Sequence, residues 1–126
     1  MAIAGYGRLA EMLNKPEEAK KFTEMAKRMA IEWERRADDG DHYRLAFDMP
    51  GTWSQKYNFV WDKVLGLNIL PDRIMKKEVT FYLKTQNKYG LPLDNRFTWG
   101  KTDDTVWSAT MADSEGDFQE LIRPIW

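Results

Sequence analysis

The sequence predicts a mainly α-helical fold of antiparallel helical hairpins with one or two short extended segments, and three observations support this prediction. Apolar residues recur every three or four positions over most of the chain, which is the period of an amphipathic helix. Turn residues interrupt this pattern often enough for about six helices joined by short loops, as in an array of αα-hairpins. No repeat, low-complexity tract or linker divides the chain, so residues 1–126 are expected to form a single helical unit.

The first two expected helices form a hairpin. Residues 3–13 carry apolar side chains at helical spacing, and Asn14 follows as a helix stop. Asn14 is also expected to be the N-cap of the next helix, with Glu17 completing a capping box. The apolar residues from Ala19 to Ala37 then recur on one face with charged residues between them, which predicts a long amphipathic helix.

An extended segment is expected next. The turn Asp38-Asp39-Gly40-Asp41 ends the helix, and Tyr43, Leu45 and Phe47 then alternate with other residues as in a short strand. The spacing of the aspartates does not match a calcium-binding loop, and no glutamate lies at the distance that such a loop needs. We therefore expect a solvated turn here rather than a metal site.

Four further helices are expected in the rest of the chain. They cover residues 54–67, the stretch from Pro71 to a break at Tyr89, residues 103–112, and a last helix that Ser114 caps and Pro124 ends or kinks. In the first of these, the residues expected to face inward are Tyr57, Val60, Trp61, Val64 and Leu65, with Asp62 partly outward. The loop from residue 91 to 102 is long enough to carry a function.

The composition excludes several classes of function. The net charge of −1 argues against a sequence-independent nucleic-acid binder, because such proteins need a basic surface. No apolar run is long enough to span a bilayer, so no membrane association is expected, and the N-terminus lacks the pattern of a signal peptide. The absence of cysteine excludes disulfides, thiolate zinc sites and a cysteine nucleophile.

A single histidine narrows the chemistry further. With His42 alone, multi-histidine metal sites are impossible within the chain and a Ser-His-Asp triad is disfavoured. The remaining reactive groups are carboxylates, Tyr, Lys and Trp. These are the groups used by glycoside and amide hydrolases that work by general acid and base catalysis, so we expect neither a metal nor a cofactor.

The two ends of the sequence look interrupted. The first helix has no cap before it, and the last stretch ends on Trp126. Six Trp and seven Met are a large number of bulky apolar side chains for a domain of 126 residues, because a domain of this size buries only part of its surface. We therefore expect a piece of a larger helical toroid that exposes apolar surface and self-associates through it.

Four blocks of sequence resemble the glutaminase A family. They are GYGRLA at residues 5–10, ADDGDHYRL at 37–45, PGTWSQKYN at 50–58 followed by VWD at 60–62, and GLPLDNR at 90–96. These blocks extend over nearly the whole chain, and the third is far more specific than a short pattern such as a single G-x-G. One departure stands out: where the family is expected to read K-S-D-W-x-x-W, residues 101–107 read KTDDTVW, so Asp104 replaces a Trp beside Asp103.

The resemblance implies a helical domain of the six-hairpin (α/α) toroid type, of which this chain would be a part. It also implies a larger, exported parent protein in an extracellular or periplasmic location. The family name implies hydrolysis of L-glutamine to glutamate and ammonia, hence an enzyme with a small-molecule substrate.

In such a toroid the site lies in the central cavity, and this selects the candidate residues. The candidate catalytic carboxylates are Asp62, Asp94 and Asp103. The candidate substrate-binding residues are Trp53, Gln55, Tyr57, Asn58, Asn95 and Arg96.

Each candidate also has a structural interpretation. Arg96 could clamp a substrate carboxylate, or Asp94 and Asn95 could form a turn in which Arg96 makes a local ion pair. Asp62 lies mid-helix beside Lys63, where a surface ion is the commoner role. Trp53 is expected to pack in the core rather than to bind a ligand.

Two classes of function stay open. The first is a hydrolase, either glutaminase-like or acting on a glycoside, and the second is a non-catalytic module that holds a sugar or an amino acid. A second carboxylate about 5 to 10 Å from Asp94 or Asp103 would favour hydrolysis. The fold alone cannot choose, because one scaffold hosts many activities.

Overall fold

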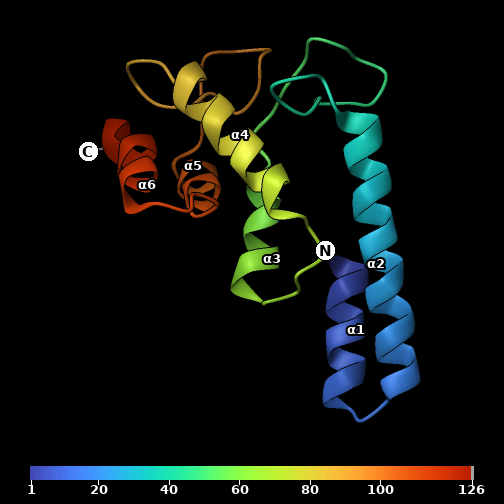
Figure 1. Cartoon of the computed structure of the whole chain (residues 1–126). Helices are drawn as coiled ribbons and strands as arrows, with labels where there is room; N and C mark the ends of the chain where they lie inside the picture. The colour runs from blue at the N-terminus through green and yellow to red at the C-terminus, as the bar shows by residue number, and fades with distance from the viewer. Residues whose placement is uncertain (126) are drawn as a thin grey trace.

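Helices account for nearly all the regular secondary structure of residues 1–125, which a computed structural model describes (Figure 1). The α-helices are α1 (Ala2–Met12), α2 (Pro16–Ala37), α3 (Val60–Val64), α4 (Asp72–Thr85), α5 (Thr102–Ala109) and α6 (Glu115–Ile122). Two short 3-10 helices, η1 (Tyr57–Phe59) and η2 (Arg123–Ile125), flank α3 and α6. The predicted mainly α-helical class is confirmed.

Helices α1 and α2 form the predicted antiparallel hairpin (Figure 1). Asn14 is a helix stop, as predicted: its φ of 58° is left-handed, and Lys15 N donates to Ala10 O at 2.9 Å across the turn. The predicted capping box is wrong. The N-cap of α2 is Lys15 and no side chain caps it, because Asn14 has already adopted the left-handed conformation that closes α1.

Residues 43–47, predicted to be a short strand or an extended segment, do not form a strand. The described residues form only an isolated bridge here, between Asp38 and Tyr43. The Asp39 carboxylate closes the segment into an irregular loop, because it accepts from Gly51 N at 2.6 Å and from the Arg44 guanidinium at 2.9 Å.

The helix predicted over residues 54–67 is much shorter, and its buried face differs. Residues 54–56 are not helical, and left-handed Gly66 lies just beyond the helix end. Val64 and Leu65 are 63% and 53% exposed, whereas Asp62 is buried. Val60 is buried as predicted. Asp62 is buried beside it because both of its carboxylate oxygens accept backbone N–H groups of the chain that follows α3.

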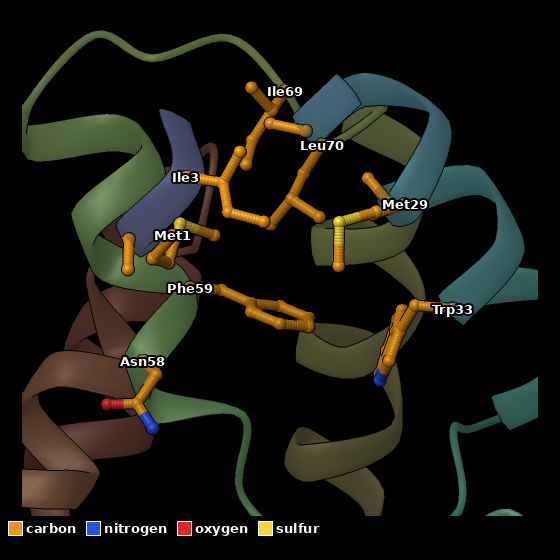
Figure 2. Close-up of a pocket in the computed structure, with 11 residues that line it drawn as sticks. Met1, Ile3, Met29, Trp33, Asn58, Phe59, Ile69 and Leu70 are labelled. Atoms are coloured by element: carbon orange, nitrogen blue, oxygen red, sulfur yellow. The ribbon is translucent and has the colours of Figure 1, made fainter. Parts of the chain in front are cut away.

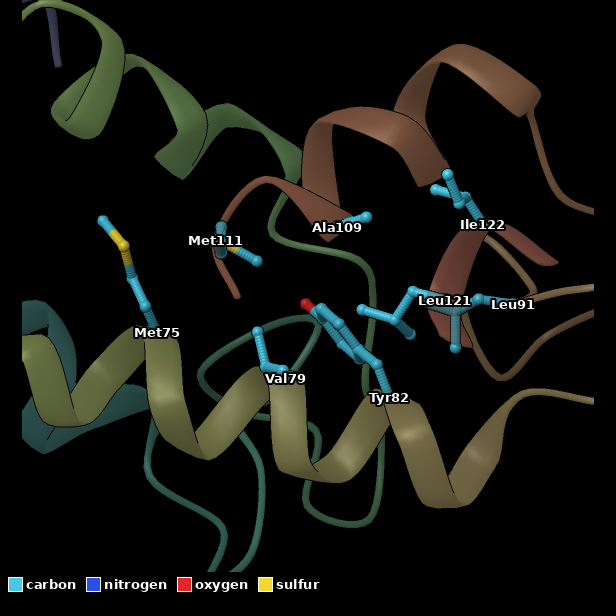
Figure 3. Close-up of a cluster of buried hydrophobic side chains, with 8 residues drawn as sticks. All are labelled: Met75, Val79, Tyr82, Leu91, Ala109, Met111, Leu121 and Ile122. Carbon is cyan, nitrogen blue, oxygen red and sulfur yellow. The ribbon is translucent and has the colours of Figure 1, made fainter. Parts of the chain in front are cut away.

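The main core gathers around α4 (Figure 3). Its buried members are Met75, Val79 and Tyr82 of α4, Leu91 of the following loop, and Ala109, Met111, Leu121 and Ile122 from α5, α6 and their connection. The last helix is as predicted: Ser114 Oγ accepts from Asp117 N at 3.1 Å as an N-cap, and the α-helix ends at Ile122, where η2, which contains Pro124, begins.

The α1/α2 hairpin meets the rest of the chain at a smaller apolar cluster formed by Ala4, Ala26 and Ile69. Beside it lies a cavity of about 380 Å³ whose walls include Met29, Trp33 and Phe59 (Figure 2). Leu9 and Met12 in the last part of α1, and Leu13 directly after it, are exposed apolar side chains. We call these three residues the exposed row of α1.

Self-association through this exposed row stays a prediction. None of the helices in the described part of the chain has the length and apolar character needed to cross a membrane.

Replacing Gly7 by alanine tests the close approach of α1 to α2. An added Cβ would lie 3.2 Å from Thr23 N and 3.3 Å from Ala19 O, so the two helices must move apart. We expect Gly7→Ala to lower the free energy of unfolding by about 1–3 kcal/mol. Gly5→Ala in the same helix meets nothing within 4 Å and should raise it by about 0.5–1 kcal/mol. Urea denaturation measures both; equal effects of the two substitutions would contradict the close approach.

Candidate functional site

Two segments far apart in sequence are joined near four of the candidate residues. Gln55 N donates to Leu93 O at 2.8 Å, and Asn95 N donates to Trp53 O at 3.3 Å. The Asn95 side-chain oxygen in turn accepts from Trp53 N at 3.2 Å. The structure therefore brings Trp53, Gln55, Asp94 and Asn95 together, and it does so through backbone pairing.

Asp94 and Arg96 form a local ion pair, which is one of the two roles that the sequence analysis considered for Arg96. The guanidinium contacts both carboxylate oxygens, at 3.0 and 2.6 Å, and Arg96 N donates to the same group at 2.9 Å. The hydrogen bonds from the Arg96 side chain, the largest cause, hold the pKa of Asp94 below its usual value. This engaged pair has little capacity left to clamp a substrate.

Gln55 is buried and its side chain is fully used within the chain. Its amide nitrogen donates to Leu91 O and Pro92 O, at 3.0 and 3.1 Å, and its oxygen accepts from Ser108 Oγ at 3.0 Å. It thereby fixes the loop after α4 onto α5. Trp53 packs edge-on against Phe81 with ring centroids 5.5 Å apart, which agrees with its expected packing role.

Asp62 likewise serves the fold. Its two oxygens accept from Ile69 N at 3.0 Å and Leu70 N at 3.2 Å. The predicted surface ion next to Lys63 is wrong, because Asp62 is buried. Lys63 Nζ instead donates to carbonyls just after α5, including Ala112 O at 2.9 Å. Asn58 is exposed and lines the cavity between the hairpin and η1 (Figure 2).

An exposed aromatic cluster lies where η1 and α3 meet α5. The Trp107 ring lies 5.7 Å from the Trp61 ring and 6.2 Å from the Tyr57 ring, measured between centroids. Trp61 and Trp107 remain 38% and 36% exposed, so the inward prediction for Trp61 is wrong. Asp103 lies one turn before Trp107 in α5, on the same helix face. We call Tyr57, Trp61, Asp103 and Trp107 the α3/α5 surface.

The two adjacent aspartates of α5 have opposite surroundings. Asp103 is exposed, and its carboxylate has no hydrogen-bond or ion-pair partner within residues 1–125. Asp104 is buried, with Lys101 Nζ 4.0 Å from its carboxylate. Burial, and then the charge of Asp103, raise the pKa of Asp104. Of the three predicted catalytic carboxylates, only Asp103 is both exposed and unengaged in the described chain.

The sequence interpretation missed a buried polar network around Glu78. This carboxylate is fully buried and accepts from Tyr43 N at 2.8 Å and from the Tyr82 hydroxyl. Lys56 Nζ lies 3.9 Å away and donates to Tyr43 O and Ser54 O, both at 2.9 Å. Burial is the main cause that raises the pKa of Glu78 and lowers that of Lys56. A signal existed: Glu78 lies four residues from both Ile74 and Tyr82, within the apolar stripe of α4.

His42 lies at the edge of this network. Its ring stacks on Phe81 with centroids 4.6 Å apart, and its Nδ1 lies 2.8 Å from an Asp41 oxygen. The buried Nε2 has no hydrogen-bond partner in the described chain. Within residues 1–125, no three histidine or acidic side chains converge in a way that could hold a metal ion.

The Glu78 network can be tested by changing the acceptor alone. Glu78→Gln keeps the side-chain shape but places an amide where carboxylate oxygens accept from Tyr43 N and Tyr82. We expect the free energy of unfolding to fall by about 1–3 kcal/mol. The control Glu24→Gln, on the exposed face of α2, should change it by less than about 0.5 kcal/mol. Chemical denaturation of both variants provides the measurement, and a neutral Glu78→Gln would show that the network does not stabilise the fold.

The Asp94–Arg96 pair predicts a pH dependence. The folded pKa of Asp94 lies below its ordinary value of 3.8, so its contribution to stability is present above pH 3.8 and is lost as the pH falls through the folded value. Asp94→Asn should therefore be less stable than the parent chain by about 1 kcal/mol at pH 7. The two should converge in acid, and a stability difference that stays constant down to pH 2 would refute this assignment.

Comparison with known proteins places the chain in a family. Residues 1–126 match the family model described as the glutaminase A six helical-hairpin domain. Glutaminase A of Aspergillus oryzae is 32% identical over 77% of this chain, and a probable glutaminase of Arthroderma benhamiae is 26% identical over 80% of it. The chain spans 15% of the length of each of these relatives. No solved structure gives a significant match. The resemblance found in the sequence is therefore confirmed, and the chain belongs to the glutaminase A six helical-hairpin domain family.

Proposed function

We propose that this chain is part of a hydrolase that acts on the side-chain amide of L-glutamine, and that it contributes the α3/α5 surface to the substrate site. The names of the two relatives support the reaction class. The observation that carries the assignment of the surface is the exposed, unpartnered Asp103 carboxylate one helical turn from the Trp107 ring. The other two predicted carboxylates are held by their own chain, Asp62 by backbone amides and Asp94 by Arg96.

The reaction sets clear chemical requirements. Water adds through its oxygen to the side-chain carbonyl carbon, the C–N bond breaks, and the nitrogen leaves as ammonia after it gains a proton. A base must take the proton from water, and donors must stabilise the oxyanion that forms. Because the chain spans 15% of its relatives, we assign to it a part of the substrate contacts and leave the remaining groups to the rest of the protein. An exported location for the whole protein likewise stays a prediction.

The aromatic rings favour a second candidate function. Half-exposed Trp61 and Trp107 can stack on the apolar face of a sugar ring, as exposed aromatic side chains do in many ligand sites. A glycoside-processing or sugar-binding domain would use the same surface with Asp103 as a hydrogen-bond acceptor. The two candidates differ in whether the substrate releases ammonia.

Ammonia release from L-glutamine by the full-length protein that contains this domain tests the proposal. We expect turnover, and we expect Asp103→Asn to lower kcat/KM by about 10- to 100-fold, since a charged contact to the substrate contributes about 1.5–3 kcal/mol. Asp72→Asn is the matched control, because Asp72 also lies in the first turn of a helix and outside the α3/α5 surface. It should leave kcat/KM within about twofold of the parent value.

Two results would contradict the proposal. If the protein releases no ammonia from L-glutamine or other amides but binds or cleaves glycosides, the second candidate, a glycoside-processing or sugar-binding domain, would be established. Equal losses in Asp103→Asn and Asp72→Asn would show that the α3/α5 surface does not contact the substrate.

A further inference from the structure

We infer that the α3/α5 surface recognises a primary ammonium group, so that Asp103 and the Trp107 ring bind the α-ammonium of an amino-acid substrate. This inference rests on the proposed function, and it assigns Asp103 to substrate specificity rather than to the activation of water. Three features carry it: the charge balance around Asp103, the direction of the aromatic side chains, and the exposure of the carboxylate.

The charge balance leaves Asp103 without a cation. The lysines on the neighbouring elements are engaged elsewhere: Lys56 bonds to Tyr43 O and Ser54 O, and Lys63 bonds to carbonyls just after α5. Lys101 lies 4.0 Å from the carboxylate of Asp104. An exposed carboxylate that its own chain does not neutralise is suited to a cationic ligand group.

The aromatic side chains are placed to complete such a site. Side chains on a helix lean toward its N-terminus, so the Trp107 ring covers the surface over the turn that carries Asp103. The Tyr57 and Trp61 rings pack against Trp107 at 6.2 and 5.7 Å and hold it in place. An indole face attracts cations, and it does so in addition to a carboxylate on the same side. A ligand ammonium can therefore meet a negative charge and a π face together.

The exposure of Asp103 argues against a role as general base. A carboxylate that takes a proton from water at neutral pH usually lies in a buried environment that raises its basicity. Asp103 is instead exposed in the first turn of α5. An exposed carboxylate is better suited to bind a cation.

The discriminating experiment compares two amides in the full-length protein. L-glutamine and glutaramate share the side-chain amide and the carboxylate, but glutaramate carries hydrogen in place of the α-ammonium. We expect the parent protein to prefer L-glutamine in kcat/KM, and Asp103→Asn to reduce this preference about tenfold, mainly through KM for L-glutamine. Trp107→Leu should reduce it about threefold, and the control Asp72→Asn should leave it unchanged.

Each alternative has its own signature. Equal falls of kcat for both amides in Asp103→Asn, with the preference unchanged, would make Asp103 the base and overturn the inference. Calorimetric titration with the same two compounds separates binding from turnover. If the protein binds L-glutamine without releasing ammonia, and Asp103→Asn weakens this binding, the inferred ammonium site is supported and the proposed hydrolysis is contradicted. If the parent protein hydrolyses both amides with equal kcat/KM, the proposed hydrolysis is supported and the inferred ammonium site is contradicted.

Discussion

The buried carboxylate of Glu78 is the constraint on which the middle of this fold depends. It connects three segments: α4, which carries it; the loop after α2, through Tyr43 N; and the segment before η1, through Lys56 and the Tyr82 hydroxyl. Burying such a charge costs free energy unless hydrogen bonds and an opposite charge compensate it. Here both are present, and in the described chain the two irregular segments form only isolated backbone bridges, between Asp38 and Tyr43 and between Ser54 and Asp94. The network therefore holds the loop after α2 and the segment before η1 against α4, as hydrogen bonds between strands would in a β-sheet.

The Glu78 network also determines the positions of aromatic residues in the candidate site. Lys56 N donates to the Tyr82 hydroxyl at 2.7 Å, which fixes the residue immediately before Tyr57 against α4. From there η1 and α3 continue without a break, so the positions of Tyr57 and Trp61 follow from the position of Lys56. Gln55 fixes the other side, because its amide joins the loop after α4 to Ser108 of α5. The aromatic rings consequently lie on a surface whose backbone is held from two directions by buried polar contacts.

The sequence predicted the parts of the fold that apolar periodicity determines, and it failed where side chains bond to the backbone. The long stripe of α2 and the Ser114 cap of α6 are local patterns, and both were identified correctly. The strand alternative for residues 43–47 and the outward position of Asp62 were wrong, because the carboxylates of Asp39 and Asp62 accept backbone N–H groups 7 to 12 residues away. Such contacts leave no periodic signal. For the same reason the sequence could name Asp62, Asp94 and Asp103 as candidates but could not tell which carboxylate was free.

The exposed row of α1 and the α3/α5 surface differ in chemistry. This difference indicates that the first is suited to helix packing and the second to ligand recognition. The exposed row of α1 consists of Leu and Met side chains, and the two charged side chains beside it, Arg8 and Glu11, form an ion pair with each other. A surface of this kind is typical of helix packing, since it offers area without a directional group. The α3/α5 surface instead combines rings held edge to face with a carboxylate that has no cation in the described chain. An unneutralised charge beside a hydrophobic surface disfavours burial against another apolar helix, because the charge would lose its hydration without gaining a partner. The same arrangement favours a small ligand that brings its own cation, which is why we place recognition on α5 rather than on α1.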